Sequence, residues 1–271
     1  MWQTYLRPGS LAEALGLLRS YGKEARLVAG GTDVLIELQR GVKPTSSLID
    51  ITTLHDLKYV RLTDGCLHIG ALATHNDIIG SQACRQYARP LVQACWEVGA
   101  PQIRTRATVV GNVVTASPAN DTITPLMALG GEVVLLSSAG ERVIPLHQFY
   151  SGVRRTICRP DDLVREIRVP VLSPDQHGLF LKLGLRRAQA ISIINVAFVL
   201  TFANDDSVSE AKITLGSLAP TIVHATTAEE YLKGKQLDET VCQEAGKLAC
   251  IDIRPIDDVR ATASYRHHPG N

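Results

Sequence analysis

The sequence predicts an α+β protein with two or three lobes. Three observations support this class: the length of 271 residues, a β-α-β pattern near the N-terminus, and a run of strand candidates followed by helices near the C-terminus. A chain of this length buries about three quarters of its unfolded surface, so it needs no disulfide or metal to fold. The C-terminal run of strands predicts a lobe with an antiparallel sheet.

The first lobe is predicted over residues 1–55. Ser10 followed by Glu13 is a capping-box pattern that marks a helix start, and the Gly30-Gly31 pair marks a turn before a second helix that Thr32 or Asp33 can cap. The expected elements are a helix from Ser10 to Gly22, a strand over 26–29, a helix over 34–39 and a strand over 47–51.

The second lobe is predicted over residues 56–158. Asp64-Gly65 between alternating apolar residues indicates a hairpin, and Thr74 can cap a helix. The stretch 99–125 is too long for an ordinary connection, so we expect a functional loop there. The other expected elements are strands over 57–62, 66–69, 132–136 and 142–144 and a helix over 89–98.

The third lobe is predicted over residues 159–271, after a joint near 145–160. Asp205-Asp206 marks a turn between two long strands. The expected elements are strands over 163–169, 179–185, 193–201 and 211–217 and helices over 226–233 and 239–250.

Composition excludes several classes of function. Lys and Arg number 28 against 27 Asp and Glu, a net charge of +1, and only 5% of residues are aromatic; both figures argue against nucleic-acid binding. No apolar run is long enough for a membrane span, and no secretory signal is visible, so we expect a cytoplasmic protein. Six cysteines are scattered without a CxxC pair, so neither a metal nor an iron–sulfur site is expected.

Two segments carry the candidate chemistry, since the standard nucleotide and hydrolase motifs are absent. In Leu27–Val34 a buried strand ends in two glycines and then in helix-capping residues, a pattern whose backbone N–H groups can bind a phosphate. A tight turn between strand and helix explains this segment equally well.

The second segment, Thr108–Asp121, places small hydrogen-bonding side chains beside apolar pairs. Gly111 permits close approach of a ligand, and Asn112 and Ser117 can donate or accept hydrogen bonds. Asp121 suits sugar hydroxyls rather than phosphate, because it is an anion. An irregular polar loop is the alternative, but the two segments together suit a dinucleotide with an alcohol-rich linker.

These segments resemble the FAD-binding subunit of the xanthine dehydrogenase and carbon monoxide dehydrogenase family, the molybdenum hydroxylases. The likeness covers nearly the whole chain. It rests on Ala29-Gly-Gly-Thr-Asp33, Gln102-Ile-Arg-Thr-Arg-Ala107, Thr108-Val-Val-Gly-Asn112 with Ala116-Ser-Pro118 and Asp121, Lys182-Leu-Gly-Leu-Arg-Arg187, Leu215-Gly-Ser-Leu-Ala-Pro220 and Arg260-Ala-Thr-Ala-Ser-Tyr-Arg266.

The resemblance implies a two-lobed FAD-binding domain of the vanillyl-alcohol oxidase type (PCMH), followed by an α+β C-terminal lobe. It places Leu27–Val34 at the FAD pyrophosphate, and it places Lys182 beside the flavin ring, where a cation stabilises negative charge. The implied FAD-binding residues are Leu27, Val28, Ala29, Gly30, Gly31, Thr32, Asp33, Val34, Thr108, Gly111, Asn112, Ser117, Asp121, Val164 and Lys182. No catalytic acid or base and no metal ligand is expected in this chain.

The sequence departs from the family pattern at three places. Val110 replaces a glycine, and we expect it to adopt a β-like φ rather than a strained positive one. No acidic residue follows Arg186-Arg187. The chain ends at His267-His-Pro-Gly-Asn271, where the family has a further helix, so we expect the last helix to be shortened or missing.

The resemblance implies an oxidoreductase subunit that passes electrons from iron–sulfur centres through FAD to NAD or another acceptor. The implied partners are a large molybdopterin-binding subunit and a small [2Fe-2S] subunit on separate chains. No cysteine lies in 127–144, so the extra [4Fe-4S] cluster of one family branch is not expected. Two alternatives remain open: a self-contained flavin oxidase of the vanillyl-alcohol oxidase type, and an assembly or binding subunit that has lost FAD.

Overall fold

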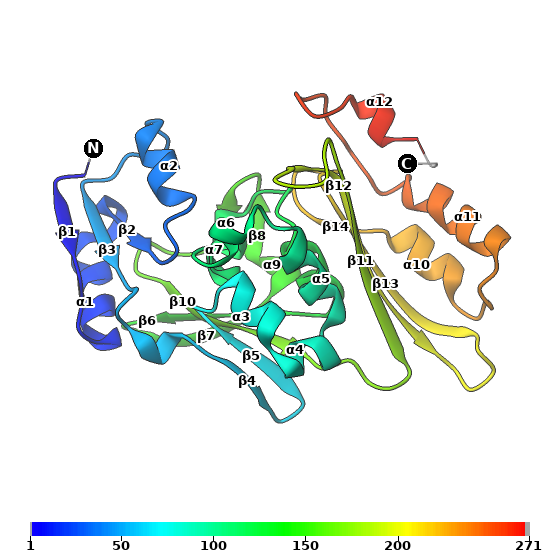
Figure 1. Ribbon diagram of the computed structural model, residues 1–271, viewed down its shortest axis with the longest axis horizontal. Helices are drawn as coiled ribbons and strands as arrows, with labels where there is room; N and C mark the ends of the chain where they lie inside the picture. Colours follow the sequence, from blue (N-terminus) through cyan, green and yellow to red (C-terminus); the bar gives the residue numbers. More distant parts are fainter. Residues whose placement is uncertain (1, 269–271) are drawn as a thin grey trace.

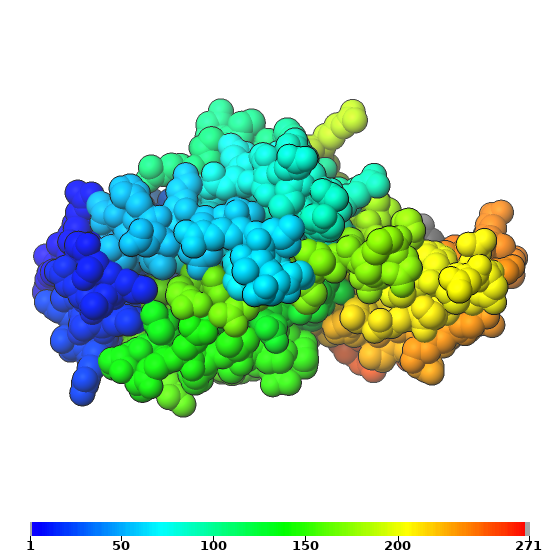
Figure 2. Space-filling view, turned by 90° about the horizontal axis from the view of Figure 1, so that it is seen from below, coloured from blue at the N-terminus to red at the C-terminus, as the bar shows by residue number. Residues whose placement is uncertain are grey.

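The structure is a computed structural model that describes residues 2–268. Three sheets of three to five strands follow one another along the long axis of the molecule, with helices packed against them (Figure 1). A fourth sheet has only two strands. The space-filling view shows the N-terminal lobe and the C-terminal lobe at opposite ends of an elongated molecule (Figure 2). No helix within the described residues has the length and apolar character that a membrane crossing needs.

The first sheet is parallel, with strand order β1-β3-β2. Helix α1 starts as predicted, because the Ser10 hydroxyl accepts a hydrogen bond from the Glu13 amide, but the Glu13 carboxylate accepts from Gly9 and so does not complete the capping box. Gly22 ends the helix at φ 51°. The lobe comprises β1 (Thr4–Leu6), α1 (Leu11–Tyr21), η1 (Gly22–Glu24), β2 (Ala25–Val28), α2 (Val34–Gln39) and β3 (Ser47–Asp50).

The second sheet is antiparallel, with strand order β4-β5-β10-β6-β7. Its central strand, β10, pairs with both β5 and β6, although the prediction assigned this strand to the C-terminal lobe, after a boundary at residue 158. Strand patterns reveal which residues are extended, whereas the pairing partner depends on distant parts of the chain. The strands are β4 (Val60–Thr63), β5 (Cys66–Gly70), β6 (Glu132–Ser137), β7 (Gly140–Pro145) and β10 (Leu163–Pro170).

About half of the predicted loop over 99–125 is helical. Val110 lies inside helix α7, so the expected β-like φ was wrong, although the strained positive φ is indeed absent. The physical reason is the Thr108 hydroxyl, which accepts from the Gly111 amide and caps a helix there. The lobe's remaining elements are η2 (His55–Leu57), α3 (His75–Gly80), α4 (Gln82–Tyr87), α5 (Arg89–Glu97), α6 (Pro101–Arg104), α7 (Val109–Thr115), α8 (Ile123–Ala128), α9 (Leu146–Phe149), β8 (Tyr150–Gly152) and β9 (Arg155–Thr156).

A buried carboxylate, Glu166, links strand β10 to neighbouring residues through hydrogen bonds. Glu166 is 3% exposed and accepts hydrogen bonds from Tyr59, His68, Arg165 and Arg168. Burial by itself would raise the pKa of Glu166, but these hydrogen bonds outweigh burial and lower the pKa from 4.5 to about 2. The carboxylate is therefore charged in the folded protein down to strongly acidic pH.

The third sheet is antiparallel, with strand order β11-β12-β13-β14, as predicted for the C-terminal lobe. Helix α10 packs on β13 and on α11. Helix α12 comprises only four residues. The prediction of a shortened last helix also concerns residues 269–271, which lie outside the described part. The elements are β11 (Gln176–Gly184), β12 (Ser192–Phe202), β13 (Val208–Gly216), β14 (Val223–His224), α10 (Thr226–Leu232), α11 (Glu239–Ala249) and α12 (Ala263–Arg266).

Candidate functional site

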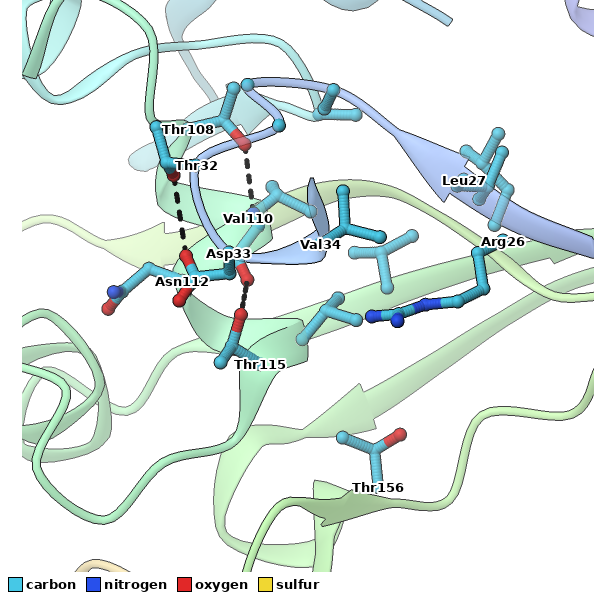
Figure 3. A pocket seen from close by; sticks show the side chains of 18 of the residues that line it. Arg26, Leu27, Thr32, Asp33, Val34, Thr108, Val110, Asn112, Thr115 and Thr156 are labelled. Atoms are coloured by element: carbon cyan, nitrogen blue, oxygen red, sulfur yellow. Dashed lines mark hydrogen bonds between the residues drawn. The ribbon is translucent and has the colours of Figure 1, made fainter. Parts of the chain in front are cut away.

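A cavity of about 780 Å³ lies between the first lobe and the central sheet. This volume falls in the range of about 300–1,000 Å³ that small-molecule and cofactor sites occupy. Figure 3 shows side chains from β2, from α7 and from β9 around it. Most of the predicted site residues line this cavity, namely Leu27, Ala29, Gly30, Gly31, Thr32, Asp33, Val34, Thr108, Gly111, Asn112 and Val164.

The first loop, residues 29–33, connects strand β2 to helix α2. The backbone amides of 30–33 donate no hydrogen bond within the described residues, so they are available to a ligand. Gly31 has φ 76°, a conformation that favours glycine. Successive backbone amides without partners, in a turn that contains a left-handed residue, form an anion-binding concavity called a nest.

Gly30 is needed for close packing between this loop and a second loop, residues 105–108, between helices α6 and α7. A Cβ atom at Gly30 would lie 2.2 Å from the carbonyl oxygen of Arg106 and 2.9 Å from Cα of Ala107. Both are backbone atoms, which cannot rotate away. The two loops are therefore in direct contact, and they form one continuous wall of the cavity.

The second loop leads into helix α7. Asn112 lies on this helix and is one of the residues that line the cavity. Its side-chain oxygen accepts a hydrogen bond from Thr122 at 2.6 Å. The –NH₂ group of Asn112 carries no hydrogen bond within the described residues, so Thr122 fixes the amide while leaving its donors available. A cofactor hydroxyl or phosphate is a suitable acceptor for them.

Several cations that the sequence reasoning missed also line the cavity. Arg154 and Arg155 belong to the β8–β9 hairpin region, which the prediction treated as a domain joint, and Arg26 precedes the first loop. Glu37 of α2 forms ion pairs with both Arg26 and Arg154, the latter at 3.1 Å. The Glu37–Arg154 pair joins the first lobe to the hairpin. No local sequence signal indicates this pair, because the contact spans 117 positions.

Asp33 is the carboxylate of the first loop that lines the cavity. Burial raises the pKa of Asp33, and the nearby Glu37 carboxylate raises it further, while Thr32 and Arg154 oppose the rise. A carboxylate in this position accepts hydrogen bonds from hydroxyl groups. It therefore suits a sugar hydroxyl beside an anion-binding loop.

Four predicted site residues do not line the cavity: Val28, Ser117, Asp121 and Lys182. Val28 is buried in strand β2, and the Ser117 hydroxyl accepts a hydrogen bond from its own loop at the Ala119 amide. Their assignment to the cofactor site remains a prediction.

Asp121 and Lys182 instead form a buried ion pair between the central and C-terminal lobes. The Lys182 ammonium lies 2.7 Å from the Asp121 carboxylate and also donates to the carbonyl of Glu97. Ser192 donates to the same carboxylate at 2.6 Å. Burial raises the pKa of Asp121, and Lys182, Ser192 and Asn195 oppose that rise.

Within residues 2–268 no cluster of three or more His, Cys, Asp or Glu side chains could hold a metal ion.

Two family descriptions match consecutive parts of the chain. Residues 2–172 match the family described as the FAD binding domain in molybdopterin dehydrogenase, and residues 180–270 match the CO dehydrogenase flavoprotein C-terminal domain. The nicotinate dehydrogenase FAD-subunit of Eubacterium barkeri is 34% identical over 239 residues, which cover 86% of this chain and 80% of that protein.

Solved structures show the same fold. A carbon monoxide dehydrogenase chain from Hydrogenophaga pseudoflava superposes with a TM-score of 0.93 at 29% identity, covering 98% of this chain and 92% of that chain. Quinoline 2-oxidoreductase from Pseudomonas putida 86 gives a TM-score of 0.91 at 25% identity, covering 98% and 92%. The two family matches, the E. barkeri relative and the shared fold together identify the chain as a member of the FAD-binding subunit family of the molybdenum hydroxylases.

Proposed function

We propose that this chain carries FAD in a multi-subunit molybdenum hydroxylase and transfers electrons from iron–sulfur centres to NAD. The observation that carries the proposal is the cavity between the two contacting loops. Its unpaired amides over 30–33 suit a diphosphate, and Asp33 and Asn112 suit hydroxyl groups. When bound, FAD supplies the chemistry that accepts single electrons and releases a hydride.

The chain's own contribution is binding, orientation and electrostatics. The first and second loops would hold the diphosphate, and the apolar side chains of Leu27 and Val164 would cover ring surfaces. Arg26 and Arg154 line the same cavity and share the single carboxylate of Glu37, so these three side chains keep one net positive charge, which favours an anionic ligand. No residue of the cavity is assigned a role as general acid or base.

Exposed apolar side chains support the proposed subunit partners. Leu181 and Leu185 of the β11 region are 56% and 68% exposed, and Ile191 is 64% exposed. Trp96 on α5, the helix packed against β11, is 57% exposed. Large apolar side chains clustered on a surface are typical of interaction sites. We propose that the iron–sulfur or molybdopterin subunit covers them.

The test begins with the full chain purified and titrated with FAD, alone and with its partner subunits. We expect the visible spectrum of a bound flavin and tight retention through gel filtration. Asn112→Ala should weaken FAD retention, whereas Asn204→Ala on an exposed turn should not. A chain that retains no flavin under any of these conditions would contradict the proposal and favour an assembly subunit that has lost FAD.

The acceptor is tested separately, by adding NADH to the FAD-loaded chain without oxygen. Bleaching of the flavin spectrum would support NAD as acceptor, and an unchanged spectrum would contradict it. Turnover of a small organic substrate by the isolated chain would instead favour a self-contained flavin oxidase.

A further inference from the structure

His75 lies next to the contact between the two cavity loops. It is the first residue of helix α3, and its backbone amide donates to the carbonyl of Ala107 at 3.2 Å. Ala107 is also the residue against which Gly30 of the first loop packs. Thr74, just before His75, pairs with Thr108 of the second loop. His75 therefore adjoins both loops that we assign to the cofactor diphosphate.

The imidazole of His75 lacks partners that a buried polar ring requires. The residue is 0% exposed, and neither ring nitrogen has a hydrogen-bond partner within the described residues. Leaving a buried polar group unpaired costs about 1–3 kcal/mol. His75 is also one of the residues that line the cavity. Its ring nitrogens are closed to solvent, so a molecule in the cavity supplies the missing partner once a small shift of the ring or of the adjoining loops opens a nitrogen to the cavity.

The charge around His75 favours an anion as that partner. Burial and, to a smaller extent, the neighbouring Arg104 lower the pKa of His75 from 6.5 to about 4, so the ring is neutral at physiological pH and has one N–H donor. Arg104 is only 9% exposed and forms no ion pair with any carboxylate among residues 2–268; its guanidinium donates to the carbonyls of Trp96 and Val98. A buried cation without a counter-charge stabilises an anion nearby.

We propose that the imidazole of His75 donates a hydrogen bond to the diphosphate of bound FAD, with the uncompensated charge of Arg104 behind it. This inference rests on the proposed function, because it concerns the same cavity. It adds a buried side-chain donor to a diphosphate site that otherwise rests mainly on the backbone amides of the first loop. His75 is a binding residue in this role and takes no part in electron transfer.

The opposing interpretation is that His75 only fills space. A phenylalanine of similar shape would fill the same volume without unpaired nitrogens. His75→Phe therefore separates the two interpretations: it keeps the packing and removes the donor. His147→Phe, at an exposed position on the short helix α9, is the matched control.

The experiment titrates the full apo chain with FAD, ADP and riboflavin, using flavin fluorescence or calorimetry. For His75→Phe we expect the Kd of FAD and of ADP to rise about 10- to 100-fold, the effect of losing one hydrogen bond to a charged group. Any riboflavin binding should keep its Kd, because riboflavin has no diphosphate. The melting temperature of the apo chain should stay equal or rise, since an unpaired buried group is removed.

Three results would overturn the inference. An unchanged Kd for FAD and ADP in a folded His75→Phe variant would leave the ring with a packing role only. An equal loss for riboflavin would indicate a distorted cavity rather than a lost diphosphate contact. A wild-type chain that binds neither FAD nor ADP would overturn the proposed function together with this inference, whereas the first two results leave the proposed function intact.

A measurement on the wild-type chain decides the question if His75→Phe fails to fold. Nitrogen-15 NMR of the histidine rings should show a shift of the buried His75 signal on addition of ADP and none on addition of riboflavin. A signal that ADP leaves unmoved would contradict the hydrogen bond.

Discussion

The contact between the two cavity loops makes a sharp prediction for Gly30→Ala. The added Cβ would sit 2.2 Å from the carbonyl oxygen of Arg106, whereas ordinary non-bonded contact needs roughly 3.5 Å. One loop must therefore move away from the other by about 1 Å. Side-chain rotation cannot relieve this clash, because the atoms that it meets belong to the backbone.

The expected magnitude follows from two effects. Overpacking of a well-packed site costs about 1–3 kcal/mol, so the free energy of unfolding of the apo chain should fall by that amount. Ligand-binding groups displaced by about 1 Å lose much of their hydrogen-bond energy, because those bonds weaken steeply with poor geometry. We expect the Kd of FAD to rise at least about 10-fold, equivalent to about 1.4 kcal/mol.

The assay pairs denaturant unfolding of the apo chain with a fluorescence titration of FAD. Gly16→Ala on helix α1 is the matched control, since a Cβ there meets nothing within 4 Å. That substitution should stabilise the chain by about 0.5–1 kcal/mol, because alanine is the better helix former, and leave FAD binding unchanged.

A Gly30→Ala chain with the stability and the FAD affinity of the wild type would refute this reasoning. It would mean that the two loops can separate freely and that their close contact does not shape the cavity.

Three further substitutions test other parts of the structure. Asp121→Asn leaves the Lys182 ammonium buried without its counter-charge, so unfolding by denaturant should show a loss of about 3–5 kcal/mol; pairing it with Lys182→Gln should cost less than the sum of the two single changes, and additive losses would contradict the ion pair. Glu166 has a folded pKa of about 2 against 4.5 unfolded, so its stabilisation is complete above pH 4.5 and is lost as pH falls from 4.5 to 2. Glu166→Gln should therefore flatten the stability curve over that range, and an unaltered acid slope would exclude this carboxylate as its source. Thr108→Val should lower the free energy of unfolding by about 1 kcal/mol through the lost helix cap, whereas Thr108→Ser should retain it; equal thermal melting of the two variants would argue against the cap.

Local signals predicted the parts of the site that local chemistry determines. Gly22 ends its helix with the positive φ that glycine favours, and the loop after strand β2 carries the unpaired amides that its glycines suggested. Thr108 shows the limit of this reasoning: its hydroxyl begins a helix, and the segment that composition marked as a loop is helical. A polar, glycine-containing stretch is compatible with both outcomes, and the cap decides between them.

Long-range contacts could not be predicted from the sequence. The ion pair between Glu37 and Arg154 and the burial of His75 both depend on which lobes face each other. The position of Lys182 beside the flavin ring, which the family resemblance implies, stays a prediction, and the structure adds that its ammonium is bonded to Asp121. A lysine's charge is visible in the sequence, whereas the carboxylate that it meets is not.

Strand β10 has a consequence for how the chain folds during synthesis. It lies in the central sheet between β5 and β6. The edges of β5 and β6 that pair with β10 therefore stay unpaired until residues 163–170 have been synthesised. Until then the nascent chain presents two open edges, which are prone to pairing with other chains. The late strand also makes this sheet rich in contacts between distant positions, a topology that folds slowly. A ribosome pause or a truncation before residue 163 would therefore convert the cofactor lobe into an aggregation-prone intermediate.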